Sequence, residues 1–185
     1  DSVIKGVRCK RCLSFSGSIR ALRRVLIDDC IAEDGTVHNA LIGSGTIRNS
    51  CAWKADPKIS VFAGTGGIMW IFYCPDASAE EIVFENSGAV MPAVTGHDQA
   101  AVFGHSQGAN VPWPKVTVRG AYAAYCSNGY SVAAAAELVI ENSIASECGT
   151  GISLPLTIPT TIKKFEYLTQ TLDPFTFNAG IYASG

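Results

Sequence analysis

The sequence predicts an all-β solenoid, in which short parallel strands stack in successive coils of about 20–23 residues. Three observations predict this class. A short phrase recurs along the 185 residues, with the order apolar, charged, Asn or a small substitute, small, apolar. Segments rich in Val, Ile and Thr are interrupted by Gly, Asn and Ser every few residues. No stretch carries a convincing helical period of apolar residues.

The phrase occurs in five clear copies and two looser ones. Their leading apolar residues are separated by steps of 20, 20, 37, 34, 22 and 22 residues. A period in this range is typical of repeats that can bury their apolar faces only against their neighbours. The clear copies are 27–31, 47–51, 84–88, 118–122 and 140–144, and the looser copies start at Val7 and Ile162.

Each position of the phrase has a predicted task. We expect the apolar positions to line the interior and the third position to bend the chain sharply, because Asn, Asp and Gly adopt left-handed backbone readily. Stacking about 4.8 Å apart would bring the amides into hydrogen-bonding range and place each second-position charge opposite its counterpart. The signs alternate within runs of consecutive coils. The predicted structural ladder comprises Asp28, Arg48, Glu85, Arg119, Glu141, Asn49, Asn86 and Asn142, with Arg8 and Lys163 at its ends.

The length predicts one domain. We expect stacked coils over 1–164, with insertions at about 52–80 and 89–115 that account for the two long steps. Each insertion is either a degenerate coil or a protruding loop. The segment 165–185 is expected to be a degenerate final coil or a terminal cap of the same domain. Function on a rigid solenoid is expected in such insertions.

Composition disfavours several function classes. The net charge is -2 and the basic residues are dispersed, so we expect neither a nucleic acid nor a membrane as partner. The longest apolar stretch, 67–74, is too short to span a bilayer, and the first residues do not read as an export signal. Seven cysteines lack zinc-site spacing, which predicts no metal, no cofactor and synthesis in a reducing compartment.

One local motif suggests a hydrolase. Gly104–Gly108 reads G-x-S-x-G, the nucleophile-elbow pattern of lipases and esterases. An elbow must be followed by a helix, which Pro112 and Pro114 oppose. All three histidines also precede Ser106, whereas the hydrolase triad requires one after it. We therefore interpret the motif as a Gly-rich loop between coils.

The segment 140–152 and its partial copies resemble the right-handed parallel β-helix family, the pectate-lyase-like fold of polysaccharide lyases, polygalacturonases and bacteriophage tailspikes. The resemblance covers most of the chain and concerns fold more than chemistry. It implies a polysaccharide ligand and, from tailspikes, a homotrimer. The acidic calcium cluster of pectate lyases and the active-site signatures of polygalacturonases are absent from this sequence.

Residues that the repeat does not explain are the candidates for function. Asp98, His97 and Asp76 lie in the long steps and are the catalytic candidates, because polysaccharide hydrolysis needs a pair of acidic groups. Sugar rings pack on exposed aromatic side chains. The candidate substrate-binding residues are Trp113, Trp53, Tyr122 and Tyr125.

We expect a module of a phage tailspike- or fibre-type virion attachment protein that binds a bacterial surface polysaccharide. It would be made in the host cytoplasm and reside in the virion tail. The first copy leaves no room for a capping element, so we expect identical partner chains or a longer parent. Whether the module also cleaves its glycan, as a glycoside hydrolase or lyase, stays open. The alternatives are a purely structural trimeric spike or stalk segment without glycan binding, and a secreted polysaccharide lyase or glycoside hydrolase of the same fold.

Overall fold

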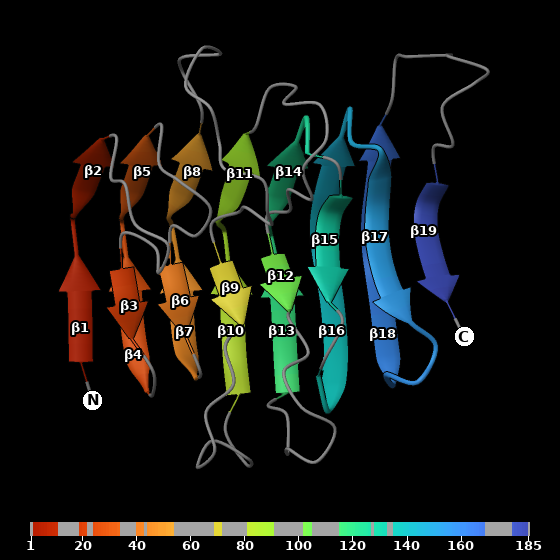
Figure 1. Cartoon of the computed structure of the whole chain (residues 1–185), viewed down its shortest axis with the longest axis horizontal. Helices are drawn as coiled ribbons and strands as arrows, with labels where there is room; N and C mark the ends of the chain where they lie inside the picture. Colours follow the sequence, from red (N-terminus) through yellow and green to blue (C-terminus); the bar gives the residue numbers. More distant parts are fainter. Residues whose placement is uncertain are drawn as a thin grey trace.

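The computed structural model describes residues 2–10, 19–21, 24–33, 40–42, 44–53, 69–71, 81–90, 102–104, 115–126, 128–132, 135–168 and 179–184. Every regular element within these ranges is a β-strand, and every strand pair is parallel. The described chain is therefore all-β. Its strands follow one another along the long axis of the molecule, with the two termini at opposite ends (Figure 1).

The strands form three rows, and the chain visits the rows in turn. The first row contains β1 (Ser2–Lys5), β4 (Val25–Asp28), β7 (Gly45–Arg48), β10 (Glu81–Glu85) and β13 (Lys115–Arg119). The second contains β2 (Arg8–Lys10), β5 (Ile31–Glu33), β8 (Cys51–Trp53), β11 (Gly88–Val90) and β14 (Tyr122–Ala124). The long strands β16 (Glu137–Ser146) and β18 (Thr160–Leu168) extend through both rows. The third contains β3 (Ile19–Ala21), β6 (Ala40–Ile42), β9 (Met69–Ile71), β12 (Val102–Gly104), β15 (Asn128–Val132), β17 (Thr150–Pro155) and β19 (Ala179–Ser184).

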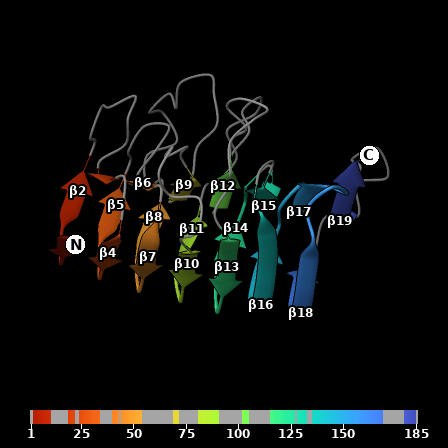
Figure 2. The same cartoon turned by 90° about the horizontal axis from the view of Figure 1, so that it is seen from below.

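The rows make two sheets. The first and second rows form one 12-stranded sheet, because β16 pairs with β13 along its first half and with β14 along its second half. The third row is a separate 7-stranded sheet. We call one strand of each row, taken in chain order, a repeat. Figure 2 shows the rows running side by side along the long axis.

A sharp bend separates the first row from the second. The residue at this bend has a positive φ in every described repeat, between 45° and 67°. Asn and Gly adopt this left-handed conformation at a low energetic cost, which explains why they recur at the third position of the phrase. The bend residues are Gly6, Asp29, Asn49, Asn86, Gly120, Asn142 and Lys164.

The first repeat starts three residues earlier than the sequence indicates. Ile4 pairs with Ile27 and Lys5 pairs with Asp28, so the bend falls at Gly6. The expectation that a copy begins at Val7 and places Arg8 next to Asp28 was wrong. Arg8 instead begins the second row, opposite Ile31.

The two long steps add no strand to the first row. Arg48 of β7 pairs directly with Glu85 of β10, and Glu85 pairs directly with Arg119 of β13. Each long step contributes one strand to the third row, β9 and β12 respectively. The additional sequence therefore lies on either side of β9 and β12, in segments outside the described residues.

The bend also changes which residues face the interior. The small residue at the fourth position is buried, with exposed fractions between 0% and 5%. The fifth position lies on the outer face, where Tyr122 is 39% and Ile144 is 38% exposed. The expectation that this apolar position lines the interior was wrong, because strand alternation resumes from the buried residue before it. The interior residue of the second row is an alanine at the sixth position, as at Ala89, Ala123 and Ala145.

One hydrophobic core joins the three rows. It contains Ile27, Ile47, Phe84, Val118 and Ile140 from the first row, with Tyr130, Val132, Ile152 and Leu154 from the third. The Tyr130 hydroxyl crosses the interior and donates to the carbonyl oxygen of Ile144, 3.0 Å away. Alanine is required in the second row because the third row lies close: a Cβ added to Gly129 would lie 2.9 Å from the Ala145 methyl carbon.

A column of buried hydroxyl groups runs along the inner side of the bends. The hydroxyls of Ser50, Ser87 and Ser143 each donate to the carbonyl oxygen two residues earlier, at 2.7–2.8 Å. Each also accepts from a backbone N–H of the preceding repeat, at 3.0–3.3 Å. These bonds satisfy backbone groups that turn away from the strand ladder at the bend.

Ala121 interrupts this hydroxyl column between Ser87 and Ser143. We expect Ala121→Ser to raise the free energy of unfolding by about 1 kcal/mol, because the new hydroxyl can donate to the Arg119 carbonyl and accept from the Ser87 N–H. Urea unfolding measures this change. Ala123→Ser is the matched control: it buries a hydroxyl outside the column and should lower stability. Destabilisation by both variants to the same extent would contradict the role of the column.

Candidate functional site

The outer face of the first row carries one continuous column of charges. In register order it contains Lys5, Asp28, Arg48, Glu85, Arg119, Glu141 and Lys163. The sign alternates at every step, including across the two long steps. Arg119 Nε lies 3.0 Å from Glu85 Oε1, and Lys163 Nζ lies 3.1 Å from Glu141 Oε1. Because these carboxylates are engaged in ion pairs, the column is a structural element and a poor source of catalytic acids.

Asp28 is the most embedded member of the column. Its side chain contacts Arg48 Nη2 at 3.1 Å and Lys5 Nζ at 3.6 Å, both through Oδ2. The Asn49 amide donates to Asp28 Oδ1 at 3.0 Å. Its partner in the neighbouring repeat is therefore this carboxylate, in place of the bend residue Asp29 that the expected ladder of third-position side chains would supply. The hydrogen bonds from Arg48 and Asn49 lower the pKa of Asp28 from 3.8 to about 2.

The outer face of the second row has a different character. Its central column contains the fifth residue of each phrase: Ile31, Cys51, Gly88, Tyr122 and Ile144. We call these residues the outer apolar strip. Arg8 and Glu166 follow at its two ends. Tyr122 and Ile144 are the exposed large hydrophobic members of this column, and exposed apolar surface is a starting point in the search for an interaction site.

Tyr122 lies flat across the strip. A Cβ added to Gly88 would come within 2.5 Å of the Tyr122 ring, so the ring occupies the space that a side chain at 88 would need. The Tyr122 hydroxyl hydrogen-bonds to the thiol of Cys51, which lies two strands away on β8. Burial against the sheet raises the pKa of Tyr122 to about 12. The ring thus spans β14, β11 and β8 in a fixed orientation, while 39% of the residue remains exposed.

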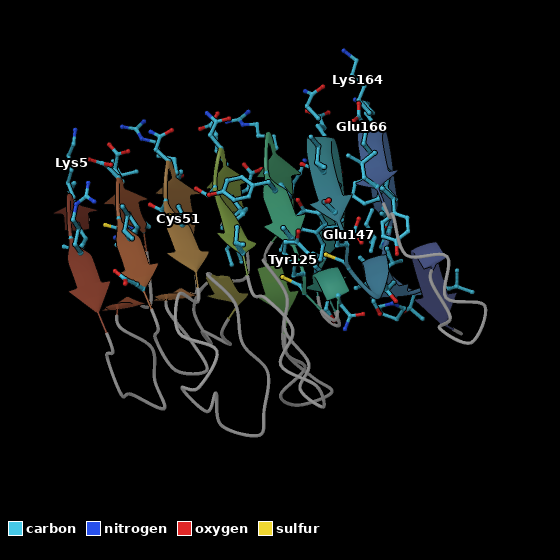
Figure 3. All side chains as sticks on the ribbon, turned by 90° about the horizontal axis from the view of Figure 1, so that it is seen from above. Lys5, Cys51, Tyr125, Glu147, Lys164 and Glu166 are labelled. Carbon is cyan, nitrogen blue, oxygen red and sulfur yellow. The ribbon has the colours of Figure 1, made fainter. Side chains whose placement is uncertain are left out.

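Tyr125 adds a second exposed aromatic side chain beside β14. Its residue is 51% exposed and has a φ of 57°, a conformation that is uncommon for a bulky side chain. Its N–H donates to the carbonyl oxygen of Ser146 at 3.0 Å, which fixes it against the neighbouring repeat. Figure 3 shows Tyr125 beside Glu147, the corresponding residue of the next repeat, with Cys51 nearer the amino-terminal end.

The other candidates from the sequence are placed only in part. Trp53 ends β8, and its backbone pairs with Glu33 and Val90 in the second row. Three of the four substrate-binding candidates, Trp53, Tyr122 and Tyr125, therefore belong to or adjoin one row. Trp113, Asp98, His97 and Asp76 lie outside the described residues.

The sequence interpretation missed the pairing of Gly88 with Tyr122. A signal was present, since Gly88 is the only glycine at the fifth position and the next copy has Tyr122 there. Recognising it requires the register that places these two residues on adjacent strands.

Nothing in the described part of the chain forms a metal centre of three or more His, Cys, Asp or Glu side chains. The described residues also include no helix with the length and apolarity to cross a bilayer. Comparison with known proteins found no matching family model, no matching curated protein and no matching solved structure.

The charge column predicts a specific acid sensitivity. Because the folded-state pKa of Asp28 is about 2 and its ordinary value is 3.8, its ion pairs stabilise the fold fully above pH 4. That contribution is lost as the pH falls from about 4 through 2. We expect Asp28→Asn to be less stable than the wild type at pH 6 and to lose less stability on acidification, measured by urea unfolding at each pH.

Asn49→Gly is the matched control for this prediction. It removes the amide donor to Asp28 while keeping a residue suited to the bend, so the folded-state pKa of Asp28 should rise toward its ordinary value and the acid-induced loss of stability should be smaller than in the wild type. Identical pH dependence in Asp28→Asn and the wild type would contradict the assignment.

Proposed function

We propose that this chain is a right-handed parallel β-helix module of a tailspike- or fibre-type virion attachment protein, which binds a bacterial surface polysaccharide along the outer apolar strip. The observation that carries the proposal is the Tyr122 ring, fixed flat over Gly88 on an outward face. The parallel rows, the in-register repeats and the shared bend support the β-helix part of the proposal.

A sugar fits this surface for physical reasons. Pyranose rings present C–H faces that pack on an aromatic ring, and hydroxyls that hydrogen-bond to polar groups at its edge. Because the sheet and Cys51 already hold the Tyr122 ring, binding requires little loss of side-chain freedom. Exposed Tyr125 lies beside the strip and can contact a neighbouring sugar unit.

The dimensions of the strip favour a chain over a single small molecule. Its five residues lie on five adjacent strands, and strand spacing is about 4.8 Å, so the strip is roughly 19 Å long. The surrounding ion pairs leave few uncompensated charges on the adjacent face. An extended polysaccharide running across the strands matches both features.

The remaining parts of the proposal rest on the resemblance to tailspikes. They are a homotrimer of identical chains, synthesis in the host cytoplasm and a place in the virion tail. If the module also depolymerises its glycan, the acidic and basic groups would come from Asp98, His97 and Asp76, near β9 and β12 in sequence.

A structural stalk is the second candidate, because one observation favours it. The ion pairs of the charge column and the hydrogen bonds of the buried hydroxyls link neighbouring repeats at several points along the axis. Such links between repeats suit a rigid rod whether or not it binds sugar. The two functions differ in whether the outer apolar strip binds a glycan.

Glycan binding can be tested with purified bacterial surface polysaccharides and isothermal titration calorimetry. We expect at least one polysaccharide to bind, and Tyr122→Leu to weaken its binding about tenfold, equivalent to ~1.4 kcal/mol. Leucine retains apolar bulk but lacks the flat aromatic face. Release of new reducing or unsaturated ends from the bound polysaccharide would assign the cleavage activity as well.

Leu156→Ala is the control, since Leu156 is 67% exposed in a turn away from the strip. Its affinity should equal that of the wild type. Failure of every polysaccharide to bind would favour the stalk, and binding that is insensitive to Tyr122→Leu would move the glycan site elsewhere.

A further inference from the structure

A second bend, at the end of the second row, carries a pair of cysteines. Tyr125 and Glu147 occupy this bend in consecutive repeats, both with positive φ, of 57° and 51°. Each is followed by a cysteine, Cys126 or Cys148, and both cysteines are only 3% exposed. Free cysteines are often buried as small apolar side chains, which accounts for their burial but not for their equivalent positions in consecutive repeats.

The two thiols point in the same direction. Cys126 Sγ donates to the Ala124 carbonyl at 3.6 Å, and Cys148 Sγ donates to the Ser146 carbonyl at 3.4 Å. This is the bond that the serine hydroxyls make at the first bend, to the carbonyl two residues earlier. The thiols therefore occupy equivalent inner positions in adjacent repeats.

Backbone hydrogen bonds hold the two cysteines side by side. The N–H of Tyr125 donates to the Ser146 carbonyl at 3.0 Å, and the N–H of Gly149 donates to the Cys126 carbonyl at 3.1 Å. These bonds continue the strand register through the bend. Adjacent strands lie about 4.8 Å apart, within the ~4.4–6.8 Å range of Cα separations that a disulfide bridges.

We propose that Cys126 and Cys148 are an oxidation site at which a disulfide forms between adjacent repeats when the folded protein meets a low-molecular-weight disulfide such as oxidised glutathione. The inference is independent of glycan binding. It supplies a covalent tie at the second bend, where the described repeats have thiols in place of the serine hydroxyls of the first bend.

The chemistry proceeds by two exchanges. The Cys148 thiolate attacks one sulfur of oxidised glutathione, forming a mixed disulfide and releasing one glutathione thiolate. The Cys126 thiolate then attacks the Cys148 sulfur, closes the protein disulfide and releases the second glutathione. Two protein thiols are oxidised, one glutathione disulfide is reduced to two thiols, and the thiol protons pass to solvent or to the released thiolates.

The electrostatics of the pair favour Cys148 as the first nucleophile. Interaction with the neighbouring Cys126 thiol lowers the pKa of Cys148, whereas the same interaction and burial raise the pKa of Cys126 well above its ordinary value. The Tyr167 hydroxyl donates to the Cys148 carbonyl at 2.5 Å and helps to hold this backbone in place.

The other fully described cysteines lack such a partner in register. Cys30 is followed along its column by Ser50, whose hydroxyl accepts from the Cys30 N–H at 3.1 Å. Cys51 is in the second row and hydrogen-bonds to Tyr122. Among the free cysteines whose side chains the structure describes, only Cys126 and Cys148 occupy the same position of consecutive repeats.

The test is oxidation followed by peptide mapping. The reduced protein is incubated, folded, with oxidised glutathione, remaining thiols are alkylated under denaturing conditions, and peptides are identified by mass spectrometry. We expect a single major cross-linked peptide joining 126 to 148 within one chain, and a higher urea midpoint for the oxidised protein than for the reduced protein. Because both thiols are buried, oxidation should be faster at a low, non-denaturing concentration of urea, which makes local opening of the fold more frequent.

Three variants control the experiment. Cys126→Ser and Cys148→Ser should fold, since serine makes the same bond at the first bend, but should show no oxidation-dependent rise in the urea midpoint. Cys51→Ser should retain that rise. Recovery of both cysteines as alkylated thiols after oxidation, or their cross-linking to other cysteines, would overturn the proposal.

Discussion

The structure depends on one backbone constraint, the left-handed residue between the first and second rows. In every described repeat this residue takes a positive φ, and the chain turns there from one strand direction to another without a loop. The serine hydroxyls on the inner side satisfy the backbone groups that the turn would otherwise leave unpaired. Because each hydroxyl also accepts from the preceding repeat, the bends lock neighbouring repeats in one register.

The same constraint determines what the surface displays. A small buried residue follows the bend, so the next residue must face outward and the alanine after it must face inward. An apolar residue in that outward position contributes to a surface, and its repetition in adjacent strands builds the outer apolar strip. At the charged position before the bend, the register brings opposite charges together and leaves a neutralised face. The proposed binding surface is thus a consequence of the fold's repeat.

Local sequence predicted the features that repeat and missed those that depend on neighbours in space. The bends at Asn49, Asn86 and Asn142 and the alternation from Asp28 to Glu141 follow from residue type and period. The first repeat was misplaced because Val7, at its fourth position, is larger than the small residue usual there. The Tyr122 and Gly88 contact requires knowledge of which strands are adjacent. Asp98 and His97 belong to sequence that no repeat constrains, so the pattern defines no geometry for a catalytic pair.

The most direct measurement of the bend constraint compares glycine with alanine at two exposed positions. At Asn142, φ is 48°, and the account predicts that Asn142→Gly unfolds at a higher urea concentration than Asn142→Ala, by ~1 kcal/mol in free energy. At Thr161, an exposed position within β18, the order should reverse, because glycine weakens an ordinary strand. Alanine more stable than glycine at both positions would contradict the claim that the left-handed bend organises the fold.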